Sequence, residues 1–293
     1  MSDNSPARLE VPERVPKRMG YRYRARARRL LLEANLAARR LAPRRMRPSV
    51  FVVGAQKAGT TSLHALLSEH PGMRAPLVKE VHYFDLAADR PARWYEAHFP
   101  AESASDDGRA LAFDTTPYYL FHPQVAARIA RYDRDARIVA LLRDPVQRAW
   151  SHYWHEWRRG FEKLEPMAAL SQEPTRLPDP HFRVGDTRRD IFAHQHYSYC
   201  ARSEYDRQLE RWFDCFPRAN ILVLKSENLF EQPEATLARL AGFLEIAPFQ
   251  SVESALNVGR YPSPPEAVGA WLRQRLAASA DATRAMLGQE FSW

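Results

Sequence analysis

Residues 49–62 read SVFVVGAQKAGTTS, and this stretch decides the fold. Four apolar residues, Val50 to Val53, form a run of strand length that enters a glycine turn. Beyond the second glycine, leucines recur at helical spacing until Pro71. The pattern predicts a buried parallel strand, a loop of small residues and a helix.

The same alternation continues along the chain. The expected strands are 49–54, 111–113, 137–142 and 221–225, and the expected helices are 60–70, 123–132, 145–157, 204–216, 227–244 and 266–287. Residues 160–195 show no clean period and are expected to form a long surface excursion. Alternating strands and helices predict one α/β domain over residues 49–293, with a P-loop-like three-layer fold and a mainly parallel central sheet flanked by helices.

The positive charge is concentrated at the N-terminus. Residues 1–48 hold 14 basic and 4 acidic residues, whereas the other 245 residues hold 29 and 31. We expect residues 1–48 to form a basic, partly helical or disordered arm, with an amphipathic helix within 21–41. The arm is either a solvated extension or a weak contact for a membrane or polyanion. The near-neutral body argues against a nucleic-acid partner, and the sequence does not indicate an oligomeric state.

Several classes of protein are excluded by composition. No run of 18 uncharged apolar residues exists, so no membrane-spanning helix is expected. The N-terminus lacks the apolar core of a signal peptide, and the chain has only two cysteines. These features predict a cytoplasmic location. Acidic residues, histidines and cysteines do not cluster at metal-ligand spacing, so no metal is expected.

The loop after the first strand predicts an oxyanion site. Gly54 and Gly59 have the spacing of a Walker A loop, but Thr60 follows the second glycine and the lysine stands at Lys57. Glycines let backbone amides turn toward an anion, and the helix N-terminus adds unpaired N–H groups. An NTP-dependent kinase would need the lysine after the second glycine. Two other functions remain possible for this loop: a kinase, or a non-catalytic protein that binds a nucleotide or polyanion. The structural alternative is a plain turn in which Lys57 faces solvent.

Residues 56–71, QKAGTTSLHALLSEHP, resemble the 5′-phosphosulfate-binding loop of sulfotransferases that use 3′-phosphoadenosine 5′-phosphosulfate (PAPS). The segment is most similar to heparan-sulfate N- and 3-O-sulfotransferases and their bacterial relatives. The resemblance implies PAPS as co-substrate, adenosine 3′,5′-bisphosphate as product, and no metal. It implies that Lys57 contacts the oxygen bridging phosphate and sulfuryl group. The donor-binding residues implied in this loop are Lys57, Ala58, Gly59, Thr60, Thr61 and Ser62.

Two further segments resemble the part of this family that binds the 3′-phosphate. Arg143 ends an expected strand, and Ser151 follows eight residues later on the expected helix. Residues 257–261, NVGRY, resemble the loop that closes over the 3′-phosphate and adenine, which implies roles for Gly259 and Arg260. The structural alternative to phosphate binding is that Arg143 belongs to a helix cap and Ser151 is an ordinary helical serine.

Residues 79–85, KEVHYFD, resemble the segment of 3-O-sulfotransferases that carries the catalytic glutamate. The resemblance implies that Glu80 is the general base, with His82 as assistant or alternate base and Lys79 as an acceptor-binding group. In an extended strand, Glu80 and His82 would share one face. A surface carboxylate balanced by Lys79 is the alternative. Thr115 stands where heparan 3-O-sulfotransferases carry a lysine that holds sulfated sugar, so the expected acceptor is a carbohydrate or natural product of unspecified type.

The resulting expectation is an enzyme that moves the sulfuryl group from PAPS to a hydroxyl or amine. The acceptor atom attacks sulfur in line with the leaving phosphate, and a carboxylate removes the acceptor proton. Lysine, arginine and backbone amides would neutralise the developing charge.

Overall fold

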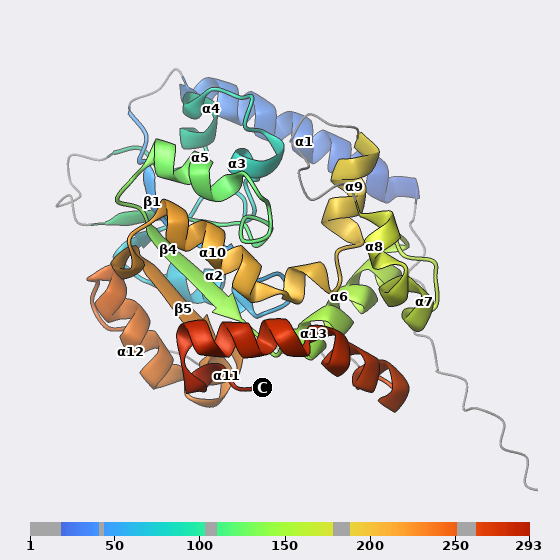
Figure 1. Cartoon of the computed structure of the whole chain (residues 1–293). Helices are drawn as coiled ribbons and strands as arrows, with labels where there is room; N and C mark the ends of the chain where they lie inside the picture. Colours follow the sequence, from blue (N-terminus) through green and yellow to red (C-terminus); the bar gives the residue numbers. More distant parts are fainter. Residues whose placement is uncertain (1–18, 41–43, 103–109, 178–187, 251–261) are drawn as a thin grey trace, which may run out of the picture.

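A five-stranded parallel sheet forms the centre of the molecule (Figure 1). The computed structural model describes residues 19–40, 44–102, 110–177, 188–250 and 262–293. The strands are β1 Pro48–Gly54, β2 Met73–Arg74, β3 Leu111–Thr115, β4 Arg137–Leu142 and β5 Ile221–Lys225. Their order across the sheet is β2-β3-β1-β4-β5.

Strand β1 lies at the middle of the sheet, as the apolar run predicts. Its Phe51 is in register with Asp114 of β3 on one side and with Ile138 of β4 on the other. Every residue from Val50 to Val53 is fully buried, and residues 138–142 are exposed by at most 1%. The predicted buried strands and the mainly parallel sheet are therefore confirmed.

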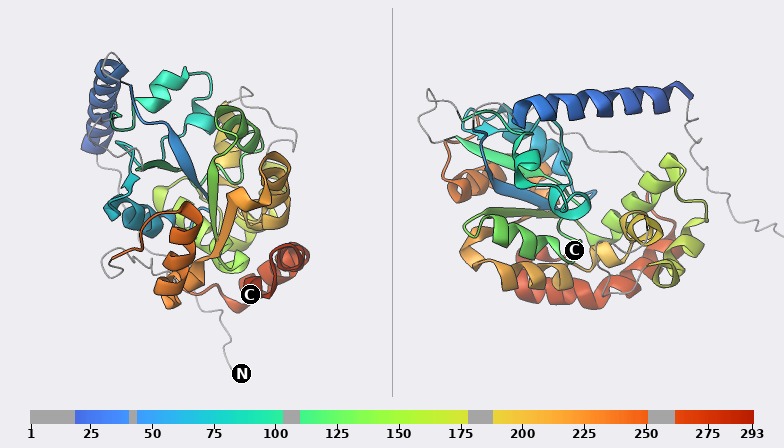
Figure 2. Two further views of the ribbon diagram at one scale, coloured as in Figure 1. Left: turned by 90° about the vertical axis from the view of Figure 1, so that its left-hand side faces the viewer. Right: turned by 90° about the horizontal axis from the view of Figure 1, so that it is seen from above.

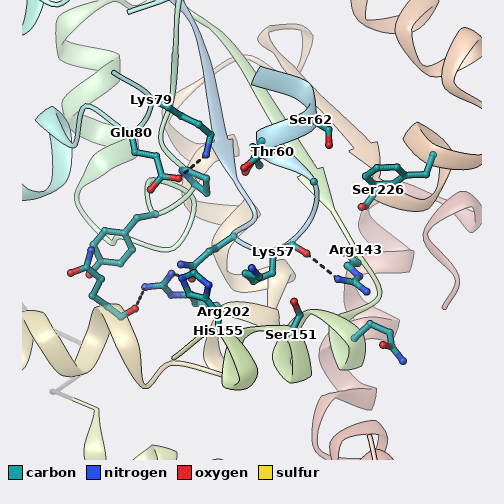
Figure 3. A pocket seen from close by; sticks show the side chains of 18 of the residues that line it. Lys57, Thr60, Ser62, Lys79, Glu80, Arg143, Ser151, His155, Arg202 and Ser226 are labelled. Carbon is teal, nitrogen blue, oxygen red and sulfur yellow. Dashed lines mark hydrogen bonds and ion pairs between the residues drawn. The ribbon is translucent and has the colours of Figure 1, made fainter. Parts of the chain in front are cut away.

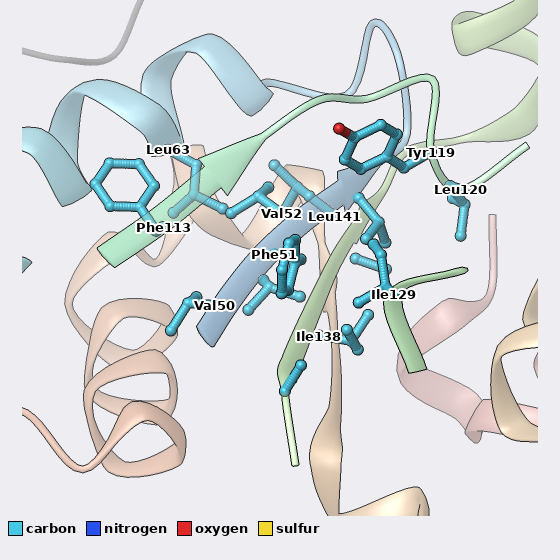
Figure 4. Packing of buried hydrophobic residues seen from close by; sticks show 14 of the residues in the cluster. Val50, Phe51, Val52, Leu63, Phe113, Tyr119, Leu120, Ile129, Ile138 and Leu141 are labelled. Carbon is cyan, nitrogen blue, oxygen red and sulfur yellow. The ribbon is translucent and has the colours of Figure 1, made fainter. Parts of the chain in front are cut away.

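Helices cover both faces of the sheet (Figure 2). The α-helices of the described residues are α1 Met19–Arg40, α2 Thr60–Glu69, α3 Tyr83–Leu86, α4 Ala92–Glu96, α5 Val125–Tyr132, α6 Pro145–Arg159, α7 Pro166–Ser171, α8 Glu173–Arg176, α9 Arg188–His196, α10 Tyr205–Cys215, α11 Ser226–Glu231, α12 Pro233–Leu244 and α13 Glu266–Leu287. Right-handed crossovers place α2 and α5 on opposite faces, because the β1–β2 connection passes β3 in one direction along the sheet and the β3–β4 connection passes β1 in the other. Figure 4 shows Leu63 of α2 and Ile129 of α5 on the two sides of the strands. Helix α10 packs on α5, and α13 packs on α10 and α6.

One expectation about the architecture is wrong. The described parts of 160–195 are not an irregular surface excursion, because they hold α7, α8 and most of α9. Their residues also enter the core, since Ala169 and Leu170 are buried. Helices of four to nine residues are too short to show a sustained period in the sequence, which explains the error.

Part of the basic N-terminal segment contacts the body. Helix α1 occupies residues where the sequence predicts an amphipathic helix, and it packs on α4 (Figure 1). Leu36 is fully buried, and Arg39 Nε donates a hydrogen bond to the Ala97 carbonyl at 2.7 Å. The domain boundary at residue 48 stays a prediction. Among the described residues, no helix is both long and apolar enough to cross a membrane.

Candidate active site

A pocket of about 960 Å³ opens beyond the carboxyl ends of β1 and β4 (Figure 3). Polar and charged side chains line most of it. The predicted site residues in its lining are Lys57, Gly59, Thr60, Thr61, Ser62, Lys79, Glu80, His82, Arg143 and Ser151. Ala58 is fully buried and does not line the pocket. Gly259 and Arg260 lie outside the described residues.

The loop between β1 and α2 needs glycine at both ends. A Cβ on Gly54 would lie 2.6 Å from the Leu120 Cβ. Gly59 has φ +91° at the N-cap of α2, and a Cβ there would meet the Phe230 ring at 3.1 Å. The first N–H groups of α2 have no carbonyl partner within the helix, and the helix dipole adds positive potential. The loop therefore has the backbone geometry of an oxyanion site.

Two arginines, one between β4 and α6 and one in the first turns of α6, bind the backbone of this loop. Arg143 Nη1 donates to the Lys57 carbonyl at 3.2 Å, and Arg148 Nη1 reaches the Gln56 carbonyl at 3.5 Å. Lys57 itself has φ +73°, so its backbone is in the left-handed region. Figure 3 shows the Lys57 side chain near Arg143, Ser151 and His155.

Ser151 lies on α6 and faces the same pocket (Figure 3). Its Oγ is buried and has no hydrogen-bond partner in the described structure. One turn further on α6, burial and the charge of Lys57 lower the pKa of His155 to about 4. His155 is thus neutral at physiological pH, and the ammonium of Lys57 and the guanidinium of Arg143 are positive groups beside the Ser151 hydroxyl.

Two buried arginines carry no signal in the sequence. Arg148 is fully buried, and its Nε donates to Ser203 Oγ at 2.6 Å. Arg202 donates from Nη1 to Gln56 Oε1 at 2.5 Å and stacks on the Tyr118 ring at 4.6 Å. Burial lowers the pKa of Arg202 to about 10, which still leaves it charged at neutral pH. Arg202 follows no recognisable motif, because its contacts come from segments far away in the sequence.

Lys79, Glu80 and His82 converge, although their segment is not an extended strand. Glu80 and His82 have φ +62° and +56°, so the alternation expected of a strand does not apply. Lys79 Nζ donates to Glu80 Oε1 at 2.7 Å, and His82 Nε2 lies 3.6 Å from Glu80 Oε2. The turn thus brings all three side chains into the pocket lining, and Figure 3 shows Lys79 and Glu80 side by side on one wall.

The charges of this wall follow from its contacts. His82 Nδ1 donates to Oδ2 of the fully buried Asp85 at 2.7 Å. Burial lowers the pKa of His82, but Asp85 and Glu80 outweigh it and raise the pKa to about 10. Burial alone would raise the pKa of Glu80, but the protonated His82 at 3.6 Å and the hydrogen bond from Lys79 outweigh burial and hold the pKa at about 2. At neutral pH the wall therefore carries an ionised Glu80 and a protonated His82.

A buried carboxylate anchors this wall to the end of β3. Asp114 accepts hydrogen bonds from Tyr95 at 2.9 Å, Tyr119 at 3.1 Å and Thr116 at 2.8 Å. The Tyr119 hydroxyl in turn accepts from the backbone amide of Tyr83 at 3.0 Å. Burial, opposed by these hydrogen bonds, raises the pKa of Asp114 to about 6. This network fixes the backbone directly after His82, and the sequence carried no signal for it.

Within the described ranges, no group of three or more His, Cys, Asp or Glu residues has the geometry of a metal site. The pocket of this P-loop-like α/β fold thus has a phosphate-type loop on one side and a carboxylate–imidazolium pair on the other. The family model for the sulfotransferase domain matches residues 47–258. The chain belongs to the sulfotransferase family, which confirms the resemblance seen in the sequence.

The relatives include proteins of different size. The chain is 24% identical to the membrane-associated sulfotransferase kil1 of Dictyostelium discoideum, over 84% of this chain and 66% of that protein. It is 28% identical to human heparan sulfate glucosamine 3-O-sulfotransferase 3B1, over 67% of this chain and 46% of that enzyme. The chain thus spans less than two thirds of either curated relative. A solved sulfotransferase from Alicyclobacillus acidocaldarius superposes with a TM-score of 0.61 at 26% identity, covering 82% of this chain and 96% of that one.

Proposed function

We propose that this protein transfers the sulfuryl group of PAPS to a hydroxyl or amine of a polar acceptor. One observation carries the proposal: a single pocket is lined by Lys57, Arg143 and Ser151, with Glu80 on the facing wall, and the Ser151 hydroxyl has no hydrogen-bond partner among the described residues (Figure 3). Family membership supports the same reaction.

The donor half of the pocket suits a bisphosphorylated nucleotide. The loop amides and the N-terminus of α2 would hold the 5′-phosphate, where backbone N–H groups and the helix dipole favour an anion. Lys57 would neutralise the oxygen that leaves with the phosphate as the sulfur–oxygen bond breaks. Arg143 and Ser151 would bind the 3′-phosphate through a charged fork and a hydroxyl.

Glu80 is the better proton acceptor of the facing wall, because His82 already carries its proton. The acceptor oxygen or nitrogen forms its bond to sulfur while Glu80 takes the acceptor proton. The protonated His82 and Lys79 hold the carboxylate in place, and an entering acceptor would exchange with one of these contacts. Exchange of a positive contact for a neutral acceptor raises the basicity of Glu80 toward that needed for proton transfer.

The pocket favours a polar acceptor. Its lining contains few apolar side chains, among them Pro117, Tyr118 and Phe230. Thr115, at the position of the sugar-binding lysine of heparan 3-O-sulfotransferases, is fully buried and contacts His64 Nδ1 through Oγ1 at 3.1 Å. It is not part of the lining, so a carbohydrate or natural product bound by other groups is the acceptor we propose.

Sulfate transfer from 35S-labelled PAPS to a panel of alcohols, phenols, amines and sugars tests the reaction. Adenosine 3′,5′-bisphosphate should raise the melting temperature of the wild type, whereas ATP with Mg²⁺ should not. The shift should shrink in Lys57→Ala and Arg143→Ala, because each loses a positive group facing the nucleotide. Stabilisation by Mg-ATP but not by the bisphosphate would instead support a kinase.

Substitution of Glu80 by Gln separates catalysis from nucleotide binding. We expect turnover to fall on the order of 10²- to 10⁴-fold, since an amide cannot take the acceptor proton. Affinity for adenosine 3′,5′-bisphosphate, measured by calorimetry, should stay within about twofold of the wild type. Glu102→Gln is the matched control, because this exposed carboxylate pairs with Arg44 and is not part of the pocket lining. Equal loss of turnover and nucleotide affinity in Glu80→Gln would show that Glu80 is structural.

A further inference from the structure

A buried carboxylate lies beneath the α6 side of the pocket, and the proposed reaction does not use it. The Glu156 side chain is fully buried, and its Oε2 is 2.9 Å from His196 Nδ1 at the end of α9. Its Oε1 lies 3.5 Å from His152 Nε2 and 3.9 Å from Arg159 Nη1. Figure 3 shows the neighbouring α6 residues Ser151 and His155 on the side of the pocket away from Lys79 and Glu80.

The contact with Glu156 selects one tautomer of His196. A carboxylate only accepts hydrogen bonds, so the proton of the imidazole lies on Nδ1. Burial raises the pKa of Glu156, but the nearby His152 imidazole and the hydrogen bond from His196 outweigh it and hold the pKa well below its usual range. Glu156 is therefore ionised, and in neutral His196 the second nitrogen, Nε2, keeps its lone pair.

The pocket gives partial access to His196. His196 belongs to the pocket lining although only 7% of the residue is exposed. Both nitrogens of His152 are buried without a hydrogen-bond partner, whereas Nε2 of His196 is not among the sealed atoms. In the described structure no hydrogen bond is made to Nε2 of His196, so a molecule in the pocket can reach it.

Two aromatic rings hold the imidazole in place. The ring of Phe161 lies 4.6 Å from the His196 ring and that of Phe192 lies 4.3 Å from it, measured between centroids. Together with the bond to Glu156, these contacts fix the direction of the Nε2 lone pair before any ligand binds. A preorganised acceptor group loses little conformational entropy on binding.

Several other titratable groups lie around the part of the pocket that His196 lines. Arg159 on α6, Arg202 and Lys57 bring positive charge to the pocket lining that they share with His196. The α6 histidines do not compete for the proton, because burial lowers the pKa of His152 well below its usual value and that of His155 to about 4. In the described structure the carboxylate that contacts His196 is Glu156, which accepts the hydrogen bond from Nδ1–H.

Resting on the proposed sulfuryl transfer, we propose that His196 Nε2 binds the acceptor by accepting a hydrogen bond from a donor group next to the one that is sulfated. Glu156 is then a positioning residue that sets the tautomer. The acceptor class that fits is a molecule with at least two neighbouring hydrogen-bond donors, such as a sugar, a polyol or a catechol. A simple phenol or mono-alcohol offers nothing to His196 once its only hydroxyl faces Glu80.

We call His196 and Glu156 the dyad. The tautomer of His196 is measured by NMR of the full chain labelled with 15N-histidine and saturated with adenosine 3′,5′-bisphosphate. We expect the signal that disappears in His196→Gln to have the Nδ1–H pattern at pH 7.5. Glu156→Gln should shift this signal toward the Nε2–H tautomer that free imidazole prefers. A wild-type signal with Nε2–H, or with both nitrogens protonated, would overturn the proposal.

The role of the dyad is measured with acceptors in matched pairs, catechol with phenol and methyl β-D-glucoside with cyclohexylmethanol. In the wild type, the members with neighbouring hydroxyls should have the lower KM. His196→Ala should raise KM for these members about tenfold, the loss of one hydrogen bond, with little change in kcat. His196→Gln should recover most of the loss, because its amide oxygen accepts a hydrogen bond at a similar distance from the backbone.

Stabilisation by adenosine 3′,5′-bisphosphate is the fold control, and it should be the same in the wild type and in every variant of the dyad. If His196→Ala has the KM values of the wild type, the dyad has no role in acceptor binding and the sulfotransferase proposal stands. If the wild type transfers sulfate from PAPS to no acceptor, the proposed function fails and this inference fails with it.

Discussion

At the level of single residues, Ser151 is a hydroxyl shut off from solvent without a hydrogen-bond partner in the described structure. An unsatisfied buried group of this kind costs about 1–3 kcal/mol of folding free energy. Substitution by alanine should therefore raise the free energy of unfolding by about 1 kcal/mol and weaken binding of adenosine 3′,5′-bisphosphate about tenfold. Urea unfolding and calorimetry measure the two effects.

Ser203→Ala is the matched control for Ser151. The Ser203 hydroxyl is equally buried, but it donates to the Pro145 carbonyl at 2.9 Å and accepts from Arg148 at 2.6 Å. Its removal should destabilise the fold, since it leaves the Arg148 guanidinium short of one partner. If Ser151→Ala destabilises the protein as Ser203→Ala does and leaves nucleotide affinity unchanged, Ser151 is not a ligand group.

The His82–Asp85 pair makes stability depend on pH. His82 has a folded-state pKa of about 10 against 6.5 for the free side chain. A raised pKa contributes stability that is complete below about pH 6.5 and is lost as the pH rises through 10. Asp85→Asn should lower the free energy of unfolding by about 3 kcal/mol at pH 6, and by much less above pH 10. Urea unfolding of both proteins at pH 6, 8 and 10 measures the difference, and a difference independent of pH would contradict the assignment.

At the level of elements, most long segments could be predicted and most short ones could not. The helix α13, Glu266–Leu287, and the strand β5, Ile221–Lys225, have the bounds that the apolar spacing predicts. The strand β2, Met73–Arg74, and the four-residue helices α3 and α8 show no pattern of their own. Such short elements form because neighbours provide their hydrogen bonds and cover their side chains, so local spacing cannot reveal them.

Gly54 tests how closely the β1–α2 loop approaches its surroundings, and Gly242 of α12 is the control. Gly54→Ala places a Cβ 2.6 Å from Leu120 Cβ and 3.2 Å from the Pro117 carbonyl, so we expect a loss of about 2 kcal/mol. Gly242 lies inside α12 with nothing within 4 Å of the added Cβ. Gly242→Ala should stabilise the protein by about 0.5–1 kcal/mol, because alanine favours helix. Thermal unfolding compares the two, and a Gly54→Ala protein as stable as the wild type would show that the loop can move away.

At the level of the whole molecule, two of the leucines of α1 distinguish a helix attached to the body from a free arm. Leu36 is fully buried against the body, whereas Leu31 is 72% exposed. Leu36→Ala should lower the free energy of unfolding by about 2–4 kcal/mol, and Leu31→Ala by less than about 0.5 kcal/mol. Equal effects in urea unfolding would mean that α1 does not pack on the body in solution. Contact of residues 1–48 with a membrane or polyanion, and a cytoplasmic location, stay predictions.

The amino-acid sequence by itself determined the central strand, the glycine loop with Lys57, and the helix that follows. It did so because a buried strand, a tight loop and an amphipathic helix each leave a local pattern of residue types. It also pointed to Arg143 and Glu80 through motifs of a few neighbouring residues. Only the tertiary structure decided which side chains share the pocket. Arg202 lies 146 residues from Gln56, and His196 lies 40 residues from Glu156. Burial, pairing and proton positions depend on contacts between such distant residues, and no local pattern encodes these contacts.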